Sequence, residues 1–429
     1  MQGQALPGFR DFYPEELALR NSIFATWRDV ARRYGFQEYD GPPLEPLELY
    51  TIKSGEEIVS QLYEFTDKGD RRVALRPEMT PSLARMVGAR AQSLKKPIRW
   101  FSIPQLFRYE RQQRGRLREH FQLNMDIIGE AGPAADAEII AAVIDIMRAF
   151  GLGPKDIRVR MSDRRVLTAL LQQNPQFQGE RIKIAFDALD KSDRQSREQV
   201  GALLRDAHFD PPAVDRLFEV ASLQGLGAVV AELRTCPGGA ETGENLQSVV
   251  AALEAMGLSD FVEIDLRIVR GLAYYTGIVF ELFDAKQTLR AICGGGRYDN
   301  LIREIAGIDL PCVGFGMGDV VLGELLKEKG KATEAPSQLD AFLIAVSSED
   351  VAFVLKLARE LRDRGIAVEY ALRHAPIRKQ LELAVAHGAA RAVIVGPDER
   401  KAKVAVVRDL KTGRQRKVPL VKVRKGILK

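Results

Sequence analysis

Hydrophobic residues recur at helical spacing near the start of the chain. Within residues 15–34 the apolar positions lie mostly three or four residues apart: Leu17, Leu19, Ile23, Trp27, Val30 and Ala31. This spacing predicts an amphipathic helix that ends at Gly35. Similar patterns predict helices over 134–150 and 164–172 and a charged helical region over 195–235. We interpret residues from about 170 to 250 as an inserted helical subdomain.

Alternating patterns predict strands elsewhere. Residues 98–128 are predicted to form two strands joined by a basic loop, and 263–270 and 278–284 to form two more around a Gly-containing turn. The charged, aperiodic segment 327–340 is typical of a linker. Beyond it, AFLIAV, the amphipathic EDVAFVLKLARELRDRG, IAVEY, a helix near 377–386 and RAVIVG follow a βαβαβ order. That order predicts a small sheet with a parallel core.

Composition and charge add a division of the chain. The 429 residues are 46% hydrophobic and 28% charged, which is typical of a globular protein with two or three domains. Residues 341–429 contain 20 Lys+Arg and 9 Asp+Glu, a balance of +11, which leaves −6 for residues 1–340 out of the total of +5. A basic C-terminal module on an acidic body suggests a polyanionic partner.

Several classes of protein are disfavoured. Three cysteines and four histidines without metal-ligand spacing argue against a disulfide framework and a zinc site, so no protein-ligated metal site is predicted. No apolar run reaches 18 residues, so we predict no membrane partner. The first residues, MQGQALPGFRDFYPEE, lack the features of signal and transit peptides, and we expect a cytoplasmic location.

The segment richest in candidate chemistry is LFRYERQQRGRLREHFQLNMDIIG, residues 106–129. Because alternate side chains of a strand share a face, we expect Arg108 and Glu110 on one face of the first arm. One face of the second arm collects polar groups: Arg116, Arg118, His120, Gln122, Asn124 and Asp126. Such groups bind phosphates and carboxylates, so this face suits a polyphosphate nucleotide and a small zwitterion. The alternative is a hairpin whose polar face is merely solvated.

Three further motifs are less specific when each is taken alone. RGLAYYTGIVFELFD places Arg270 at the end of an alternating strand, and its two tyrosines are more often core residues than ligand contacts. CGGGRYDNL permits close approach of a ligand or a strained turn, and it is not a P-loop because no Gly-Lys-Ser/Thr follows. VALRPEMTPSLAR puts Glu78 and Thr80 between two prolines, where Thr80 is alternatively a helix cap.

Taken together and in this order, the motifs resemble the histidyl-tRNA synthetases, a family of class II aminoacyl-tRNA synthetases. The resemblance covers nearly the whole chain through GFRDFYPEE, the motif 1-like YGFQEYDGPPLE, the motif 2-like FRYERQQRGRLREHFQ, the signature-like RGLAYYTG and CGGGRYD, and VGFGMGD at the place of motif 3. It implies an α+β fold: an antiparallel sheet flanked by helices, a helical insertion and a small α/β anticodon-binding domain. The implied parts are a catalytic core over 1–326, a linker over 327–340 and the anticodon domain over 341–429, in a homodimer.

The resemblance also implies roles for single residues. For ATP it places Arg108 at the α-phosphate, Glu110 at the adenine amine, Arg116 at the distal phosphates and His120 where a Phe usually stacks on adenine. For histidine it places Glu78, Thr80 and Gln122 at the α-ammonium and Asp126, Tyr274 and Tyr275 at or near the imidazole. Arg270 would bind histidine and, with Arg108, would be catalytic at the α-phosphate. Arg111 and Gln113 would meet the tRNA acceptor end.

The implied reaction forms histidyl-adenylate and pyrophosphate from ATP and histidine, with Mg²⁺ accompanying the phosphates, and then transfers histidine to the 3′-terminal adenosine of tRNA(His). The sequence departs from the usual family pattern at motif 3. Gly318 is followed by Asp319, Val320 and Val321 in place of x-Glu-Arg, so the arginine expected at the γ-phosphate is absent. Ala273 replaces an aspartate and Asp126 a glutamate, and a branch of the family that includes plant organellar enzymes shows similar departures.

Three other interpretations compete with a histidine-activating enzyme. The histidine-sensing regulatory subunit of ATP phosphoribosyltransferase has a similar core but lacks the anticodon domain, so the basic module and Arg108, Glu110 and Arg270 argue against it. A synthetase for another amino acid is disfavoured by the two histidine signatures. A tRNA-binding regulator without chemistry is supported only by motif 3. The basic segment 411–429 is expected to contact tRNA phosphates, the alternative being a merely soluble tail.

Overall fold

The computed structural model describes residues 3–51, 59–111, 113–192, 195–270, 274–332 and 339–427. The chain divides into two compact units, Met1–Thr333 and Glu334–Lys429. The segment predicted as a linker, 327–340, begins in helix because α13 (Asp319–Glu328) continues to Glu328, and its residues 333–338 lie outside the described part. Each unit is described separately below.

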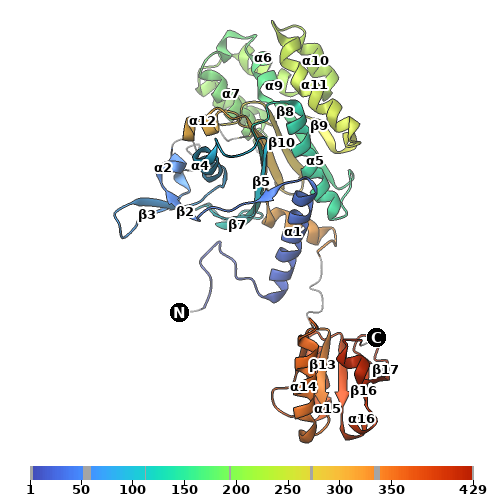
Figure 1. Ribbon diagram of the computed structural model, residues 1–429. Coiled ribbons are helices and arrows are strands. Elements are labelled where there is room, and N and C mark those ends of the chain that lie inside the picture. The colour runs from blue at the N-terminus through green and yellow to red at the C-terminus, as the bar shows by residue number, and fades with distance from the viewer. Residues whose placement is uncertain are drawn as a thin grey trace. The chain divides into compact units, whose positions relative to one another are not determined.

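A nine-stranded sheet forms the centre of the N-terminal unit (Figure 1). Its order is β1-β5-β7-β12-β11-β10-β8-β9, with β6 also paired to β7, and only the β1–β5 and β8–β9 pairs are parallel. The strands are β1 (Gln37–Glu38), β5 (Ile98–Ser102), β6 (Gln105–Phe107), β7 (Glu119–Ile128), β8 (Ile157–Asp163), β9 (Val262–Ile264), β10 (Ile278–Asp284), β11 (Cys293–Arg297) and β12 (Cys312–Gly318). The predicted α+β class with a mainly antiparallel sheet is confirmed.

The alternation along β7 gives the sheet one apolar face. Leu123, Met125 and Ile127 are at most 1% exposed and belong to the main hydrophobic core. The same core contains the buried sides of α1 (Pro14–Arg33) and α5 (Pro133–Ala149), which match the helices predicted over 15–34 and 134–150. The other face of β7, with Gln122, Asn124 and Asp126, therefore remains available for a site.

Shorter elements cover that other face of the sheet (Figure 1). They are the small sheet β2-β4-β3, with β2 (Leu44–Pro46), β3 (Tyr63–Thr66) and β4 (Arg72–Leu75), and the helices α2 (Glu48–Thr51), α4 (Thr80–Arg90) and α12 (Leu301–Ala306). Leu83 and Val87 of α4 pack with Leu301 of α12 in a second cluster of buried residues. This cluster holds the beginning of α4 beside the polar side of β7.

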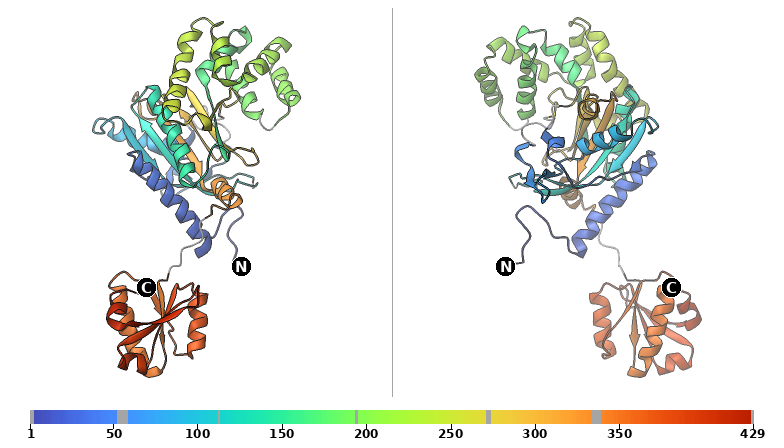
Figure 2. Two further views of the ribbon diagram at one scale, coloured as in Figure 1. Left: turned by 90° about the vertical axis from the view of Figure 1, so that its right-hand side faces the viewer. Right: turned by 60° about the vertical axis from the view of Figure 1, so that its left-hand side comes forward.

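A helical insertion follows β8 and ends before β9 (Figure 2). It contains α6 (Arg164–Leu171), α7 (Arg181–Lys191), α8 (Arg197–Asp206), α9 (Pro211–Ala221), α10 (Gly225–Leu233) and α11 (Gly239–Ala255). Local signals set the N-termini of α8 and α9, since Ser196 and Gln199 form a capping box at α8 and Asp210 caps α9. The charged region 195–235 is helical, as predicted.

The C-terminal unit is a five-stranded sheet with order β14-β13-β15-β16-β17. The predicted βαβαβ part comprises β13 (Ala341–Ala345), α14 (Val351–Arg362), β14 (Val368–Tyr370), α15 (Ile377–Ala386) and β15 (Arg391–Val395), and its three strands are parallel. α16 (Pro397–Lys401), β16 (Val404–Asp409), β17 (Gln415–Pro419) and α17 (Leu420–Arg424) complete the unit. Segment 411–429 is therefore not a merely soluble tail, because Val418, Leu420 and Val423 are buried in this unit's core.

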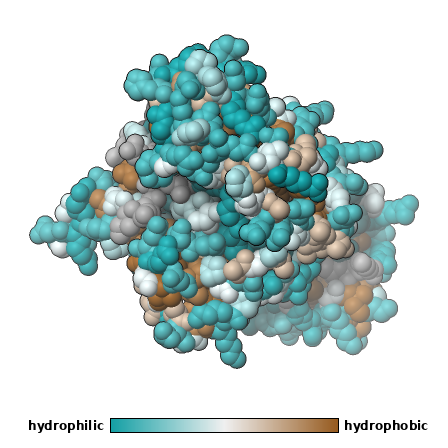
Figure 3. Space-filling model, turned by 90° about the horizontal axis from the view of Figure 1, so that it is seen from above, coloured by the Kyte–Doolittle hydropathy of each residue, from teal (hydrophilic) through white to brown (hydrophobic). Residues whose placement is uncertain are grey.

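None of the described helices is both long and apolar enough to cross a membrane. Figure 3 shows hydrophilic residues predominating on one face of the molecule, with hydrophobic residues scattered among them in small groups.

A buried ion pair fixes β11 against the N-terminus of α5 and leads to a stability prediction. Arg297 and Asp136 are at most 2% exposed, and the guanidinium donates to the carboxylate at 3.0 and 2.7 Å. Asp136→Ala leaves the buried guanidinium of Arg297 with the half-exposed Asp299, at 3.3 Å, as its remaining ion-pair partner. The change should lower the free energy of unfolding by about 3 kcal/mol, whereas Asp136→Leu with Arg297→Met should lose much less. Urea unfolding followed by the fluorescence of Trp27 and Trp100, which both lie in this unit, measures the difference. Equal losses of unfolding free energy in the single and double variants would show that the side chains of Arg297 and Asp136 are not coupled.

Candidate active site

The pocket is built on a floor of glycines, here called the glycine floor: Gly294 of β11 and Gly314 and Gly316 of β12. A Cβ atom on Gly314 would lie 1.9 Å from Oδ1 of Asp126, and one on Gly316 would lie 2.7 Å from Cδ of Gln122. A Cβ atom on Gly294 would lie 2.2 Å from Nη1 of Arg270. These separations are far below van der Waals contact, so the polar side chains occupy the space that side chains at the three glycines would need.

One side of the glycine floor is a small polar pocket with aromatic walls. Its lining includes Glu78, Thr80, Gln122, Asn124, Asp126, Tyr274, Tyr275 and Tyr298. Asp126 is 4% exposed and accepts a hydrogen bond of 2.5 Å from the Tyr298 hydroxyl. The Tyr274 hydroxyl donates to Glu78 at 3.2 Å. Two buried carboxylates in a pocket of this kind suit a small ligand with several N–H donors.

Burial controls the protonation of Asp126. Removal from water raises its pKa from the ordinary 3.8 to about 7, although the hydrogen bond from Tyr298 acts in the opposite direction. The folded chain therefore binds more protons than the unfolded chain between about pH 4 and 7. The stability contribution of this group is fully present below the ordinary pKa and is lost as the pH rises toward 7.

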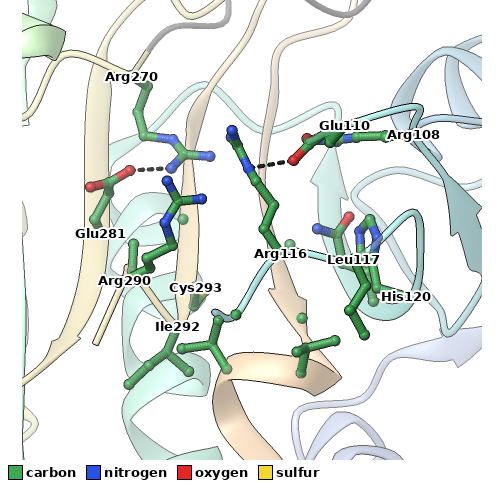
Figure 4. Close-up of a pocket in the computed structure, with 18 residues that line it drawn as sticks. Arg108, Glu110, Arg116, Leu117, His120, Arg270, Glu281, Arg290, Ile292 and Cys293 are labelled. Carbon is green, nitrogen blue, oxygen red and sulfur yellow. Dashed lines mark hydrogen bonds and ion pairs between the residues drawn. The ribbon is translucent and has the colours of Figure 1, made fainter. Parts of the chain in front are cut away.

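The other side of the glycine floor is rich in arginine. Arg108, Arg116, Arg270 and Arg290 line this second pocket together with Glu110, Glu281 and His120. Figure 4 shows the guanidinium groups of Arg116, Arg270 and Arg290 directed into the same space. Arg116 is paired with Glu110 and Arg270 with Glu281, while Nε of Arg108 donates to the Pro77 carbonyl at 2.9 Å. Such a group of cations suits a polyphosphate.

His120 lies at the edge of this arginine-rich pocket as a neutral group. Burial, followed by the positive charge of Arg108, lowers the pKa of its imidazole to about 3. An uncharged ring beside the cations suits contact with a planar base better than contact with a phosphate.

Arg270 lines both pockets and connects them. Burial disfavours its charged form, but Glu281 outweighs burial and raises the pKa of Arg270 above its ordinary value. The prediction that Arg270 ends a strand over 263–270 is wrong, because β9 ends at Ile264. Asp265 accepts from the backbone N–H of Arg267 at 3.0 Å and turns the chain, and Arg270 has φ +59°. This left-handed backbone directs the side chain across the glycine floor rather than along a sheet.

The predicted hairpin is also shorter than expected. β6 ends at Phe107 and β7 begins at Glu119, so Arg108, Glu110 and Arg116 lie in the connection rather than on strand faces. Gly115, with φ +72°, allows a tight turn closed by the Gln113–Arg116 bridge. Arg118 stacks on the Tyr109 ring at 4.0 Å instead of joining the polar face. The face formed by His120, Gln122, Asn124 and Asp126 does line the pockets, as predicted.

Eleven of the residues expected from the sequence come together in these two joined pockets. They are Glu78, Thr80, Arg108, Glu110, Arg116, His120, Gln122, Asp126, Arg270, Tyr274 and Tyr275. Thr80 is the first residue of α4 and not its cap, since Met79 occupies the cap position and no side chain caps this end. Arg111 and Gln113 are exposed and line neither pocket. Ala273 lies outside the described residues.

Among the polar side chains that line the two pockets, sequence reasoning missed Glu281, Arg290 and Tyr298. Glu281 had a signal, since it is the acidic residue inside the apolar strand IVFELFD. Tyr298 is the second residue after the three glycines, and its hydroxyl donates to Asp126. Arg290 had no signal, because it lies in an irregular loop between β10 and β11.

The aspartate at the motif 3 position has a structural contact. Asp319 pairs with Arg10 at 2.9 Å and accepts from the backbone N–H of Phe121 at 2.9 Å. It therefore ties the N-terminal segment and the start of α13 to β7. Val320 and Val321, which follow it, line the arginine-rich pocket. Within the described residues, no group of three His, Cys, Asp or Glu side chains is placed to hold a metal ion.

The hydrogen bond from Tyr298 to Asp126 generates a titration prediction. Tyr298→Phe removes the donor that favours the carboxylate, so the pKa of Asp126 should rise by about one unit or more above about 7. ¹³C NMR of chain labelled at the aspartate carboxyls measures the midpoint, with Asp126→Asn identifying the signal. An unchanged titration midpoint in Tyr298→Phe would show that the hydrogen bond from Tyr298 does not stabilise the ionised form of Asp126.

Comparison with known proteins connects this geometry to a family. The profile described as "Histidyl-tRNA synthetase" matches residues 8–318, and that described as "Anticodon binding domain" matches 340–429. The chain is 45% identical to the Histidine--tRNA ligase of Opitutus terrae, over 97% of this chain and 96% of that protein. It is 40% identical to the "Histidine--tRNA ligase, chloroplastic/mitochondrial" of Arabidopsis thaliana, over 96% and 84% of the two chains.

A solved structure agrees with these sequence relatives. The crystal structure of histidyl-tRNA synthetase from Nostoc sp. PCC 7120 matches with a TM-score of 0.85 at 25% identity, covering 100% of this chain and 99% of that one. The family model over residues 8–318 and the 45% identity over 97% of the chain show that the chain belongs to the histidyl-tRNA synthetase family.

Proposed function

We propose that this chain is a histidine–tRNA ligase, which forms histidyl-adenylate and pyrophosphate from histidine and ATP and transfers the histidyl group to the 3′-terminal adenosine of tRNA(His). The observation that carries the proposal is the junction of the two pockets, which share Arg108, Gln122 and Arg270. The polar pocket, which suits a small zwitterion, adjoins the arginine-rich pocket, which suits a polyphosphate and is called the cationic pocket from here on. The carboxylate of one ligand and the α-phosphate of the other would meet at the shared arginines.

The polar pocket supplies partners for each end of histidine. Glu78, Thr80 and Gln122 would bind the α-ammonium group, and Asp126 would accept an imidazole N–H, with Tyr274 and Tyr275 forming the walls. With a pKa of about 7, Asp126 shifts readily to the carboxylate when an N–H donor binds. A side chain that cannot donate would leave this buried group unpaired, and such a penalty gives strong selection without editing.

The cationic pocket would bind ATP in the orientation that the reaction needs. Arg108 and Arg270 would flank the α-phosphate, Arg116 the distal phosphates, Glu110 the adenine amine and neutral His120 the ring. Arg116 and Glu110 form an ion pair with each other. This pair would have to separate when the nucleotide binds, so that each side chain can contact the nucleotide. A fixed cation at the α-phosphate stabilises the charge that develops during in-line attack, an effect of about 3 kcal/mol for comparable single donors.

Magnesium would arrive with the phosphates of ATP. Since Glu110 would bind the adenine amine, the carboxylate that the pocket offers near the phosphates is Glu281, which is paired with Arg270. Oxygen ligands of this kind fit Mg²⁺, which keeps several waters and is bound largely by substrate phosphates. When bound, the ion would neutralise part of the triphosphate charge.

The C-terminal unit would bind the anticodon arm of the tRNA. It carries the basic balance of +11, and Arg416, Lys417 and Lys422 are exposed on β17 and α17. Exposed cations can hold the backbone while loop bases are recognised. Arg111 and Gln113, exposed in the connection between β6 and β7, would meet the acceptor end. We also propose a homodimer and a cytoplasmic location, as the family resemblance implies.

Isotope exchange between ATP and pyrophosphate, measured with each of the twenty amino acids, tests the proposed function. Exchange should depend on histidine alone, and Arg270→Ala should reduce its rate by about two orders of magnitude or more while circular dichroism is unchanged. Exchange with another amino acid would reassign the substrate. No exchange, together with retained histidine binding, would favour a regulatory paralogue that has lost the chemistry.

A further inference from the structure

The cationic pocket lacks a positive charge at Val321, three residues after Gly318. Val320 and Val321 line its wall, and Val321 is 8% exposed. A valine side chain contributes neither charge nor a hydrogen-bond donor, so no side chain in the α13 wall of the pocket supplies a positive charge for a terminal phosphate. A cationic side chain for that phosphate has to come from another part of the chain.

Arg290 reaches the same place from a different element. A Cβ atom on Gly115 would lie 3.1 Å from Cγ2 of Val321 and 3.9 Å from Cδ of Arg290, so the two side chains approach the same point of the connection between β6 and β7. Nη2 of Arg290 also lies 3.4 Å from Oε1 of Gln113. Figure 4 shows its guanidinium beside that of Arg270, directed into the pocket.

The loop that carries Arg290 is held in place by its own contacts. The Asp284 carboxylate accepts from the backbone N–H groups of Thr288 and Leu289 at 3.1 and 2.9 Å. Leu289 and Ile292 are 8% and 2% exposed, so both sides of Arg290 are anchored in the core. Because the backbone is already fixed, binding of a ligand would have to order only the side chain of Arg290 and not the loop.

The charge balance of the pocket agrees with a role in anion binding. Four arginines and two glutamates line it, and the glutamates are paired with Arg116 and Arg270. The charged residues of the lining therefore carry an excess of two positive charges. A guanidinium also offers the forked donors that match the oxygens of a phosphate.

We propose that Arg290 binds the terminal phosphate of ATP and so replaces the arginine that is missing at Val321. The proposal rests on the proposed function, because it assigns the β- and γ-phosphates to the wall formed by Val321 and Arg290. Pyrophosphate, which consists of these two phosphates, should depend on the same side chain for its binding.

Steady-state ATP–pyrophosphate exchange by Arg290→Met tests the proposal. The KM values for ATP and for pyrophosphate should both rise about tenfold or more, while the KM for histidine and the inhibition constant of AMP stay unchanged. Lys286→Met is the matched control, since it removes the same charge from an exposed position of the same loop and should change none of these values. Arg290→Met with Val321→Arg should recover at least part of the loss, because the second arginine enters the same space.

Unchanged KM values for ATP and pyrophosphate in Arg290→Met would overturn the proposal. A uniform rise that includes histidine and AMP would also overturn it, by showing a structural effect on the whole pocket. If Arg290→Met with Val321→Arg recovered none of the lost affinity for ATP and pyrophosphate, the claim that Arg290 replaces the arginine missing at Val321 would be contradicted. The exchange activity of the parent chain separates this inference from the proposed function. If the parent chain shows no histidine-dependent exchange, the proposed function is wrong. If the parent chain shows exchange and Arg290→Met does not change it, only this inference is contradicted.

Discussion

The site depends on a strip of bare backbone between polar side chains. β12 lies between β7 and β11 in the sheet, and the antiparallel register pairs Gly294 with Gly316 and Gly314 with Asp126. Side chains at these glycines would occupy the space now taken by Arg270, Gln122 and Asp126. The glycine floor therefore explains why two glycine-rich motifs, CGGGRYD and VGFGMGD, occur in one chain. They are the two strands on which both ligands would lie.

The arginines above this floor are arranged before any ligand binds. Glu281 pairs with Arg270, and Glu110 pairs with Arg116. These ion pairs keep the two cations in the pocket and reduce the repulsion between them. Binding of a triphosphate would exchange carboxylate partners for phosphate oxygens, which requires little rearrangement of the backbone. The unusual residues after Gly318 fit this arrangement, because Asp319 anchors the N-terminal segment through Arg10 rather than contacting the pocket.

Periodicity in the sequence predicted the long elements and the polar face of β7, since both depend on spacing alone. It failed where side chains override the pattern: Asp265 turns the chain after β9, and Gly115 allows a turn that removes Arg116 from the strand. Family resemblance supplied the residues of the two pockets, which the structure brings together. Neither approach found Arg290, because a residue in an irregular loop has no periodicity and its neighbours in space are distant in sequence.

A double-mutant cycle between Gly294 and Arg270 tests the central claim that the glycine floor positions the arginine. Single-turnover formation of the adenylate should slow in Gly294→Ala by a factor close to that of Arg270→Ala, because the new methyl group displaces the guanidinium. In the Arg270→Ala background the same glycine change should have little further effect, and Gly227→Ala, which meets no atom within 4 Å, is the control. A rate for Gly294→Ala near that of the parent, or losses that multiply in the double variant, would contradict the account.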